Sequence, residues 1–200
     1  MNKLLFIAAL LSTTSAQAQQ FTLIETSQQS LSTTSRDVYI KGVIDQRMAF
    51  DIERRLNDLN ASSNAEIVVH ITSPGGSVYA GLEILDAMLE GASPIHTVCE
   101  GYCMSMAATL LASGDVREST ENASIMFHQL STKTQGKIDE IKADLVDADR
   151  LQLLMDKQIS VRSGMTINDV KKMESYDHFM SPEEAKKLNL IDKIRGKHGK

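Results

Sequence analysis

The chain has 200 residues, of which 42% are hydrophobic, and a formal net charge of -5 at pH 7. This length suits one well-packed domain, and no glycine- or proline-rich linker divides the chain in two. The acidic balance excludes a broad basic field of the kind that holds nucleic acid, so no polynucleotide partner is expected.

The first residues have the pattern of an export signal. Lys3 precedes the apolar run 4–11, and an Ala-Gln-Ala cleavage site follows at 16–18. We predict a signal peptide over 1–18 and a periplasmic or secreted mature chain. The apolar run is too short to span a bilayer, and we expect no integral membrane segment in the mature chain. An amphipathic N-terminus on a cytoplasmic protein is the alternative.

A polar leader precedes the predicted domain. Residues 19–36 are rich in Gln, Ser and Thr, which predicts a flexible leader, and the domain is expected over 37–196. Apolar residues over 38–44 indicate a strand, and those at helical spacing over 48–59 indicate a helix. The β-branched run 66–71 is typical of a central strand covered on both faces.

The middle of the chain continues the alternation of strands and helices. A helix is predicted over 78–89, a strand over 95–99 and a buried helix over 104–111. Residues 124–128 return as an apolar strand. Each strand is therefore followed by a helix or by a turn toward one, as in repeated β-α units.

A long helix and a short capped helix complete the predicted domain. Apolar residues keep a helical period over 137–161, longer than one small domain's core needs, so this helix is expected to reach a partner. Ser181, Pro182 and Glu184 form a capping box for a short helix through Leu188. The alternation predicts an α/β fold with a mostly parallel sheet layered with helices.

The two cysteines, Cys99 and Cys103, lie close together in the sequence. A disulfide between them would close a tiny loop and restrain the unfolded chain little. We therefore interpret them as two small apolar residues packed in a buried strand and turn, with a disulfide in an exported protein as the alternative. No His or Cys cluster has zinc spacing, so we predict neither metal nor cofactor.

Two segments have the parts of an acyl-transfer site, which needs a nucleophile, a base and amide donors for the oxyanion. Gly75 and Gly76 end a buried strand, where a backbone N–H can face a cleft; a plain tight turn is the alternative. Ser105 stands at the first turn of an apolar helix, where the helix dipole favours developing negative charge. An N-cap serine is the alternative there, and the G-x-S-x-G elbow pattern is absent.

Four segments together resemble the Clp protease proteolytic subunit family. They occur in the family's order: SPGGSVYAG at 73–81, GYCMSM at 101–106, IMFHQ at 125–129 and DHFMSPEEA at 177–185. The resemblance covers about 38–194. It implies a ClpP/crotonase-like layered α/β fold of repeated β-α units, with a mostly parallel sheet and a protruding handle helix.

The resemblance also implies a role for each of five residues in a serine endopeptidase. Ser105 would attack the peptide carbonyl, His128 would act as general base and Asp177 would orient the imidazole. The backbone amides of Gly76 and Met106 would form the oxyanion hole.

The other four histidines are weaker candidates for the base. His70 and His96 lie within predicted strands, and His198 lies in a basic tail. His178 adjoins Asp177, but neighbours in an extended segment point to opposite sides. His128, at the end of an apolar strand, is therefore preferred.

The family implies partners as well as chemistry. Peptides or unfolded proteins would be substrates, and helix 137–161 would join copies of the chain into a homo-oligomeric ring, or two stacked rings, that encloses the sites. Leu130 stands where the family usually has proline, and the leader ahead of the first strand is short and polar. A family-type AAA+ unfoldase partner is doubtful, because export would separate this chain from ATP.

Three alternatives remain open. A signal-peptide-peptidase-like, membrane-associated serine protease shares the superfamily fold but uses a lysine base. A crotonase-like protein would bind acyl-CoA through paired amides without a catalytic serine. A catalytically silent ring subunit would keep the long helix but would not react.

Overall fold

The computed structural model describes residues 35–196, and the residues from Arg36 onward belong to one compact unit. The predicted signal peptide and nearly all of the predicted leader lie outside the described residues. The described elements follow in the order β1 (Asp37–Lys41), α2 (Gln46–Ser62), β2 (Ile67–Ser73), α3 (Val78–Glu90), β3 (Ile95–Met104), α4 (Met106–Ala112), β4 (Val116–Thr120), β5 (Ser124–Phe127), α5 (Ile138–Ser163), α6 (Ile167–Met173), β6 (His178–Met180), α7 (Pro182–Lys187) and β7 (Lys193–Arg195).

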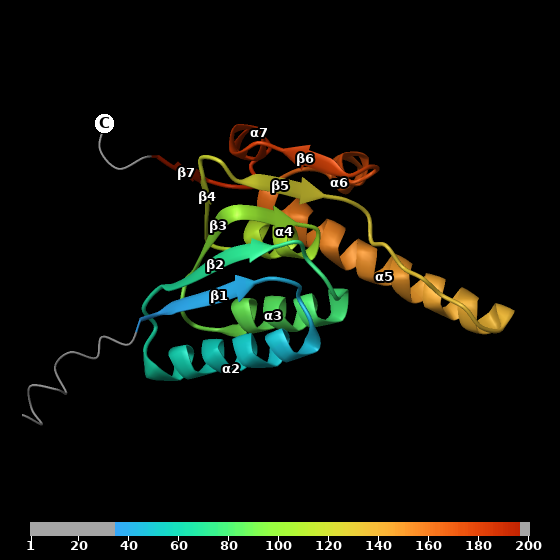
Figure 1. Ribbon diagram of the computed structural model, residues 1–200, viewed down its shortest axis with the longest axis horizontal. Helices are drawn as coiled ribbons and strands as arrows, with labels where there is room; N and C mark the ends of the chain where they lie inside the picture. The colour runs from blue at the N-terminus through green and yellow to red at the C-terminus, as the bar shows by residue number, and fades with distance from the viewer. Residues whose placement is uncertain (1–34, 197–200) are drawn as a thin grey trace, which may run out of the picture. The chain divides into compact units, whose positions relative to one another are not determined.

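The strands form one sheet with a branch at β3. The main path runs β1-β2-β3-β4-β7, while β5 pairs with β3 and β6 pairs with β5. Every strand pair is parallel except β5 with β6. Helices α2 and α3 lie side by side along β1 and β2 (Figure 1). The predicted α/β fold with a mostly parallel sheet is confirmed.

The central strand β2 is buried more completely on one face than on the other, although its sequence predicts burial of both. Ile67, Val69 and Ile71 are fully buried, but the residues between them are only half-buried, so the expectation of full cover on both faces is wrong. The open face carries His70, whose ring stacks on Tyr39 at 4.9 Å. A histidine on this face keeps the strand partly polar, as expected where no helix covers the sheet.

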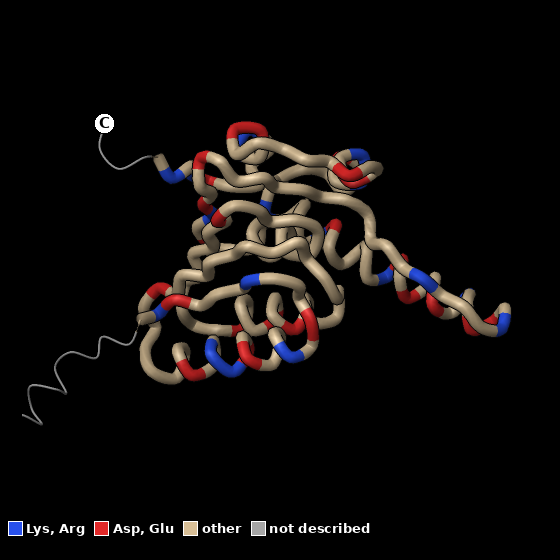
Figure 2. Tube along the Cα trace, viewed as in Figure 1, with Lys and Arg blue, Asp and Glu red and all other residues tan. Residues whose placement is uncertain are grey.

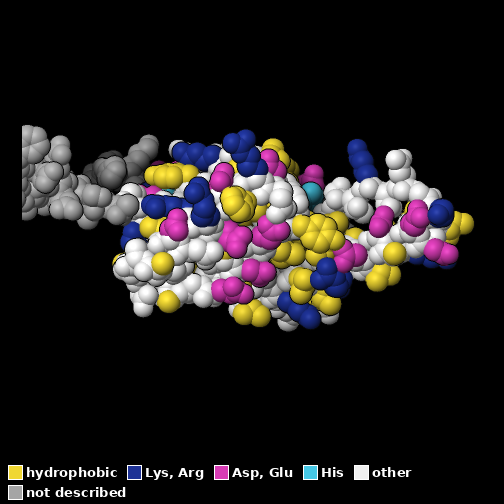
Figure 3. Space-filling view, turned by 90° about the horizontal axis from the view of Figure 1, so that it is seen from below, with side chains coloured by type: hydrophobic (Ala, Val, Ile, Leu, Met, Phe, Trp, Pro, Cys, Tyr) yellow, Lys and Arg dark blue, Asp and Glu magenta, His cyan; other side chains and the backbone are white. Residues whose placement is uncertain are grey.

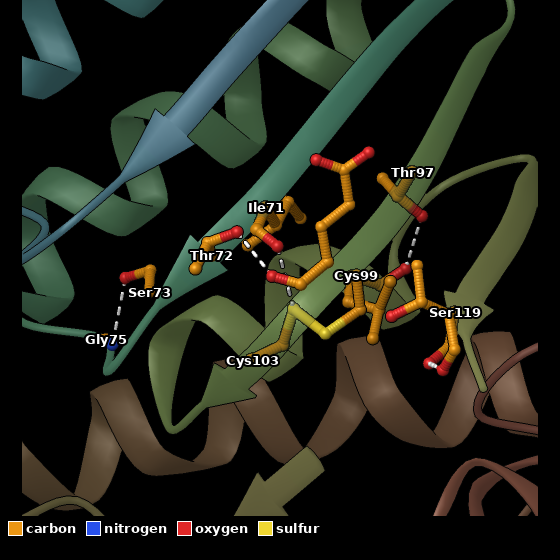
Figure 4. Close-up of a disulfide and its surroundings, with 11 residues drawn as sticks. Ile71, Thr72, Ser73, Gly75, Thr97, Cys99, Cys103 and Ser119 are labelled. Carbon is orange, nitrogen blue, oxygen red and sulfur yellow. Dashed lines mark hydrogen bonds between the residues drawn. A yellow bond between two sulfur atoms is a disulfide. The ribbon is translucent and has the colours of Figure 1, made fainter. Parts of the chain in front are cut away.

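Cys99 and Cys103 form a disulfide, so their interpretation as two separate packed residues is wrong (Figure 4). In a regular strand, Cα atoms four residues apart are separated by about 13 Å. Here the two Cα atoms are 5.9 Å apart. Cys99 pairs with Ile71 but Cys103 pairs with Ser73, so β3 bulges between the cysteines, with Gly101 at φ 92°. Sequence spacing alone does not reveal this bulge.

The bulge is also the place where β3 changes neighbours. Before it, His96 to Cys99 pair with β4; after it, Tyr102 to Met104 pair with β5. Both cysteine side chains are fully buried, so the disulfide ties the two halves of β3 together inside the core. The second half of β3 leads directly into Ser105.

Helix α5 has 26 residues and agrees closely with the long helix predicted over 137–161. Its buried residues all lie in its second half, from Leu151 to Ser163. The first half extends away from the strands (Figure 1) and exposes Ile138, Leu145 and Val146 among charged residues (Figure 2). The protruding helix of the expected fold is thus present.

The surface has no dominant charge on the face that Figure 3 shows. Lys and Arg side chains there are interspersed with Asp and Glu and with scattered hydrophobic groups. Within residues 35–196, no helix combines the length and the apolar character that crossing a membrane requires.

Candidate active site

Ser105 occupies a sharp turn between β3 and α4. Its backbone has φ 55° and ψ -128°, a region that residues with a side chain rarely adopt. Such a conformation costs on the order of 1–3 kcal/mol and persists where surrounding bonds hold it. The Ser105 N–H donates to the Met126 carbonyl at 2.8 Å, which fixes the turn against β5. The turn presents the hydroxyl at the end of a strand, as a nucleophile elbow does.

Ser105 occupies the N-cap position of α4, as the alternative expects, but its hydroxyl makes no capping hydrogen bond. Its Oγ lies 2.8 Å from Nε2 of His128. The strand register explains this approach, because Met104 of β3 pairs with Met126 of β5 and the next residues along both strands stay close. His128 follows β5 directly, and its side chain is 26% exposed.

Asp177 lies on the other side of the imidazole. Its Oδ1 is 3.3 Å from Nδ1 of His128. The antiparallel register pairs Phe127 with His178, which places the flanking residues His128 and Asp177 opposite each other. The structure therefore brings together the three side chains that the sequence singled out, with the carboxylate 67% exposed at the outer end.

The other described histidines lie away from this relay. His178 contacts Glu184, with Nε2 and Oε1 3.1 Å apart, as expected for a neighbour that points to the opposite side. The ring of His70 contacts Glu100 at 2.8 Å, and that of His96 contacts Glu118 at 3.1 Å. His198 lies outside the described residues.

Gly76 presents its amide toward the same site. Ile44 bridges Gly76 in parallel fashion, donating to the Gly75 carbonyl at 2.9 Å and accepting from the Ser77 N–H at 2.8 Å. In such a bridge the N–H and C=O of the central residue point to the opposite side, here away from Ile44. Gly76 has φ 155°, and a Cβ there would stand 2.2 Å from the Ile44 carbonyl oxygen, so only glycine fits.

Met106 is the residue predicted to carry the second amide donor. It is the first residue of α4, and the N–H groups of a helix's first turn have no acceptor within the helix. Its amide follows Ser105 directly along the chain. Gly76, Ser105 and Met106 all line one pocket.

The pocket beside Ser105 has a volume of about 280 Å³. Its walls combine apolar side chains with polar ones, of which one is acidic. The lining residues are Pro74, Gly76, Val78, Ser105, Met106, Thr109, Met126, Phe127, His128, Leu130, Ser131, Met155 and Glu174. A pocket of this volume has room for one side chain of a substrate beside Ser105.

Sequence reasoning missed the acidic residue Glu174. It follows α6 and is 3% exposed. Burial, and next the neighbouring carboxyl of Asp156, raise the pKa of Glu174 to about 8. The sequence feature that could have indicated a buried acidic site is Asp156, which lies next to Met155 on the buried face of α5. Within residues 35–196, no group of three or more His, Cys, Asp or Glu residues is arranged to hold a metal ion.

Comparisons with known proteins identify the family to which this chain is related. The model of the Clp protease family matches residues 20–198. The ATP-dependent Clp protease proteolytic subunit 2 of Synechococcus sp. (strain CC9605) is 39% identical over 134 residues, which are 64% of this chain and 66% of that relative. The match thus spans about two thirds of the curated relative's length. With the family model covering nearly the whole chain, and with the fold that the family implies, this chain belongs to the Clp protease family.

Proposed function

We propose that this chain is a serine endopeptidase that hydrolyses peptides or unfolded proteins. The observation that carries the proposal is the 2.8 Å contact between Ser105 Oγ and His128 Nε2, made at a strained turn beside a pocket. A serine hydroxyl is a weak nucleophile until a base removes its proton, and this contact supplies that base.

The proposed reaction follows from the positions of the five residues. Ser105 Oγ attacks the carbonyl carbon of the peptide while His128 Nε2 takes its proton, and the N–H groups of Gly76 and Met106 donate to the resulting oxyanion. His128 then protonates the leaving amine, which departs and leaves an acyl-enzyme. Water, deprotonated by His128, releases the acyl group. Asp177 accepts from Nδ1–H and keeps the imidazole in the required tautomer.

The proposal includes a homo-oligomeric ring, alone or stacked in pairs, that encloses the sites. The first half of α5 supports it, because Ile138, Leu145 and Val146 are exposed there and are not packed in the core of the domain. The name of the Synechococcus relative describes an ATP-dependent protease. For this chain we propose a periplasmic or secreted location and activity without an ATPase.

Two alternatives are less well supported by the site. A lysine-base protease needs a lysine beside the nucleophile, and none is among the described residues that line this pocket. A crotonase-like acyl-CoA protein does not require a serine hydroxyl in contact with a histidine. The contact between Ser105 and His128 therefore favours the peptidase.

A test compares a short fluorogenic peptide with an unfolded protein, using the purified full chain without ATP. We expect hydrolysis of the short peptide and inhibition by a serine-directed fluorophosphonate. Saturable acyl-CoA binding without hydrolysis of any peptide would contradict the proposal and favour the crotonase-like alternative. An intact ring that neither cleaves nor reacts would indicate a silent subunit.

A further inference from the structure

One residue that lines the pocket beside Ser105, Glu174, belongs to a buried pair of acidic side chains. Glu174 is 3% exposed and Asp156 is 0% exposed. Gln152 joins them, because its Nε2 donates to Asp156 Oδ1 at 2.6 Å and to Glu174 Oε2 at 2.8 Å. The second oxygen of Asp156, Oδ2, is buried and has no hydrogen-bond partner.

This acidic pair is attached to the catalytic segment. The Gln129 N–H donates to the Glu174 carbonyl at 3.0 Å, and the Leu130 N–H donates to Gln152 Oε1 at 2.6 Å. Both amides follow His128 directly in the chain. Glu174 therefore lines the pocket at a position fixed relative to the proposed base.

The pair carries negative charge, and no cation among the described residues forms an ion pair with it. Burial and the Asp156 carboxyl raise the pKa of Glu174 to about 8, so the two groups hold one proton between them at neutral pH. No ion pair within 4.0 Å joins either carboxyl to a Lys, Arg or His in residues 35–196. The other charged or titratable groups around Glu174 are His128 in the same pocket, and Asp149 and Lys171 beside the adjoining cavity. Buried charge of this kind is costly unless a counter-ion pairs with it.

We infer that Glu174, backed by Asp156, selects substrates that carry lysine or arginine immediately before the scissile bond. This inference rests on the proposed function. Val78, Met106 and Met155 would cover the methylene groups of the substrate side chain, as apolar walls do for long cations. The ammonium or guanidinium would then reach the carboxyl of Glu174, and the proton shared by the pair would leave to solvent as the ion pair forms.

The test uses three peptides that differ only in the residue before the scissile bond: arginine, its uncharged isostere citrulline, or leucine. For the wild-type chain we expect kcat/KM for arginine to exceed that for citrulline by about 10–100-fold. In Glu174→Gln the ratio should fall to about one, whatever happens to the absolute rates. Asp149→Asn, which removes an acid from the adjoining cavity only, should keep the wild-type ratio.

The pH dependence of the arginine-to-citrulline ratio distinguishes recognition of the substrate's charge from recognition of its shape. Glu174 loses its proton as pH rises through about 8, so the preference for arginine over citrulline should grow between pH 6 and pH 9. Any effect of pH on the chemical step that is common to both substrates cancels in the ratio. The ratio for Glu174→Gln should stay flat over this range.

The outcomes distinguish this inference from the function on which it rests. Hydrolysis that requires Ser105 but shows an arginine-to-citrulline ratio near one, or a ratio that Glu174→Gln leaves unchanged, overturns the inference alone. Failure to hydrolyse all three peptides overturns the proposed function and the inference with it.

Discussion

Replacing His128 by alanine is expected to lower kcat/KM for peptide hydrolysis by about 10⁶-fold, the scale seen when a triad base is lost. The reason is that Ser105 Oγ contacts Nε2 of His128 at 2.8 Å, whereas the other described histidines contact glutamates. Initial rates on a short fluorogenic peptide measure the effect.

Two further variants serve as comparisons for His128→Ala. Asp177→Asn should cost less, at most about 10⁴-fold, because the carboxylate only orients the ring and is 67% exposed. His178→Ala, one residue further along, should change the rate little, because its ring contacts Glu184 rather than Ser105. Substantial activity of His128→Ala would contradict the assigned base and support the lysine-base alternative.

Gly76→Ala is expected to lower kcat by about 10²–10³-fold, the cost of losing one oxyanion donor. The new Cβ would lie 2.2 Å from the Ile44 carbonyl oxygen, so the bridge between Ile44 and Gly76 must open and the amide must turn away from Ser105. Steady-state kinetics on the fluorogenic peptide would show the loss mainly in kcat rather than in KM.

Gly164→Ala is the control for general backbone strain. Gly164 also has positive φ, at 79°, but a Cβ there has nothing within 4 Å, and the residue follows α5 away from the pocket. Thermal unfolding should show destabilisation of both variants, with loss of kcat in Gly76→Ala only. Equal kcat in the two variants would exclude Gly76 as an oxyanion donor.

Much of the fold could be predicted because apolar residues follow regular periods. Strand β2 and the long helix α5 have strong patterns, and their predicted limits lie within about two residues of those observed. Strand β4 has no such pattern, because Arg117 is buried on it. Its guanidinium donates to Asp192 at 2.6 Å and to the Asn189 carbonyl at 2.7 Å. The buried guanidinium of Arg117 is stabilised only by partners that are distant in sequence, so sequence periodicity could not indicate its burial.

The site was predictable to a different degree at each residue. Local sequence left Ser105 open between an N-cap and a nucleophile, and the resemblance to the Clp family supplied its role and those of His128 and Asp177. Two strand registers, β3 with β5 and β5 with β6, bring these residues together, and neither register can be read from a single sequence. Glu174 was missed because a single acid after a short helix has no periodic signal, and its burial depends on packing against α5.

The most direct test of the account is covalent labelling of the folded chain with a fluorophosphonate. Only a serine activated by a neighbouring base reacts readily with such a probe. We expect one adduct per chain, mapped by peptide mass spectrometry to Ser105, and none on heat-unfolded protein or on Ser105→Ala. An adduct at another residue, or one that persists in Ser105→Ala, would contradict the assignment of the nucleophile.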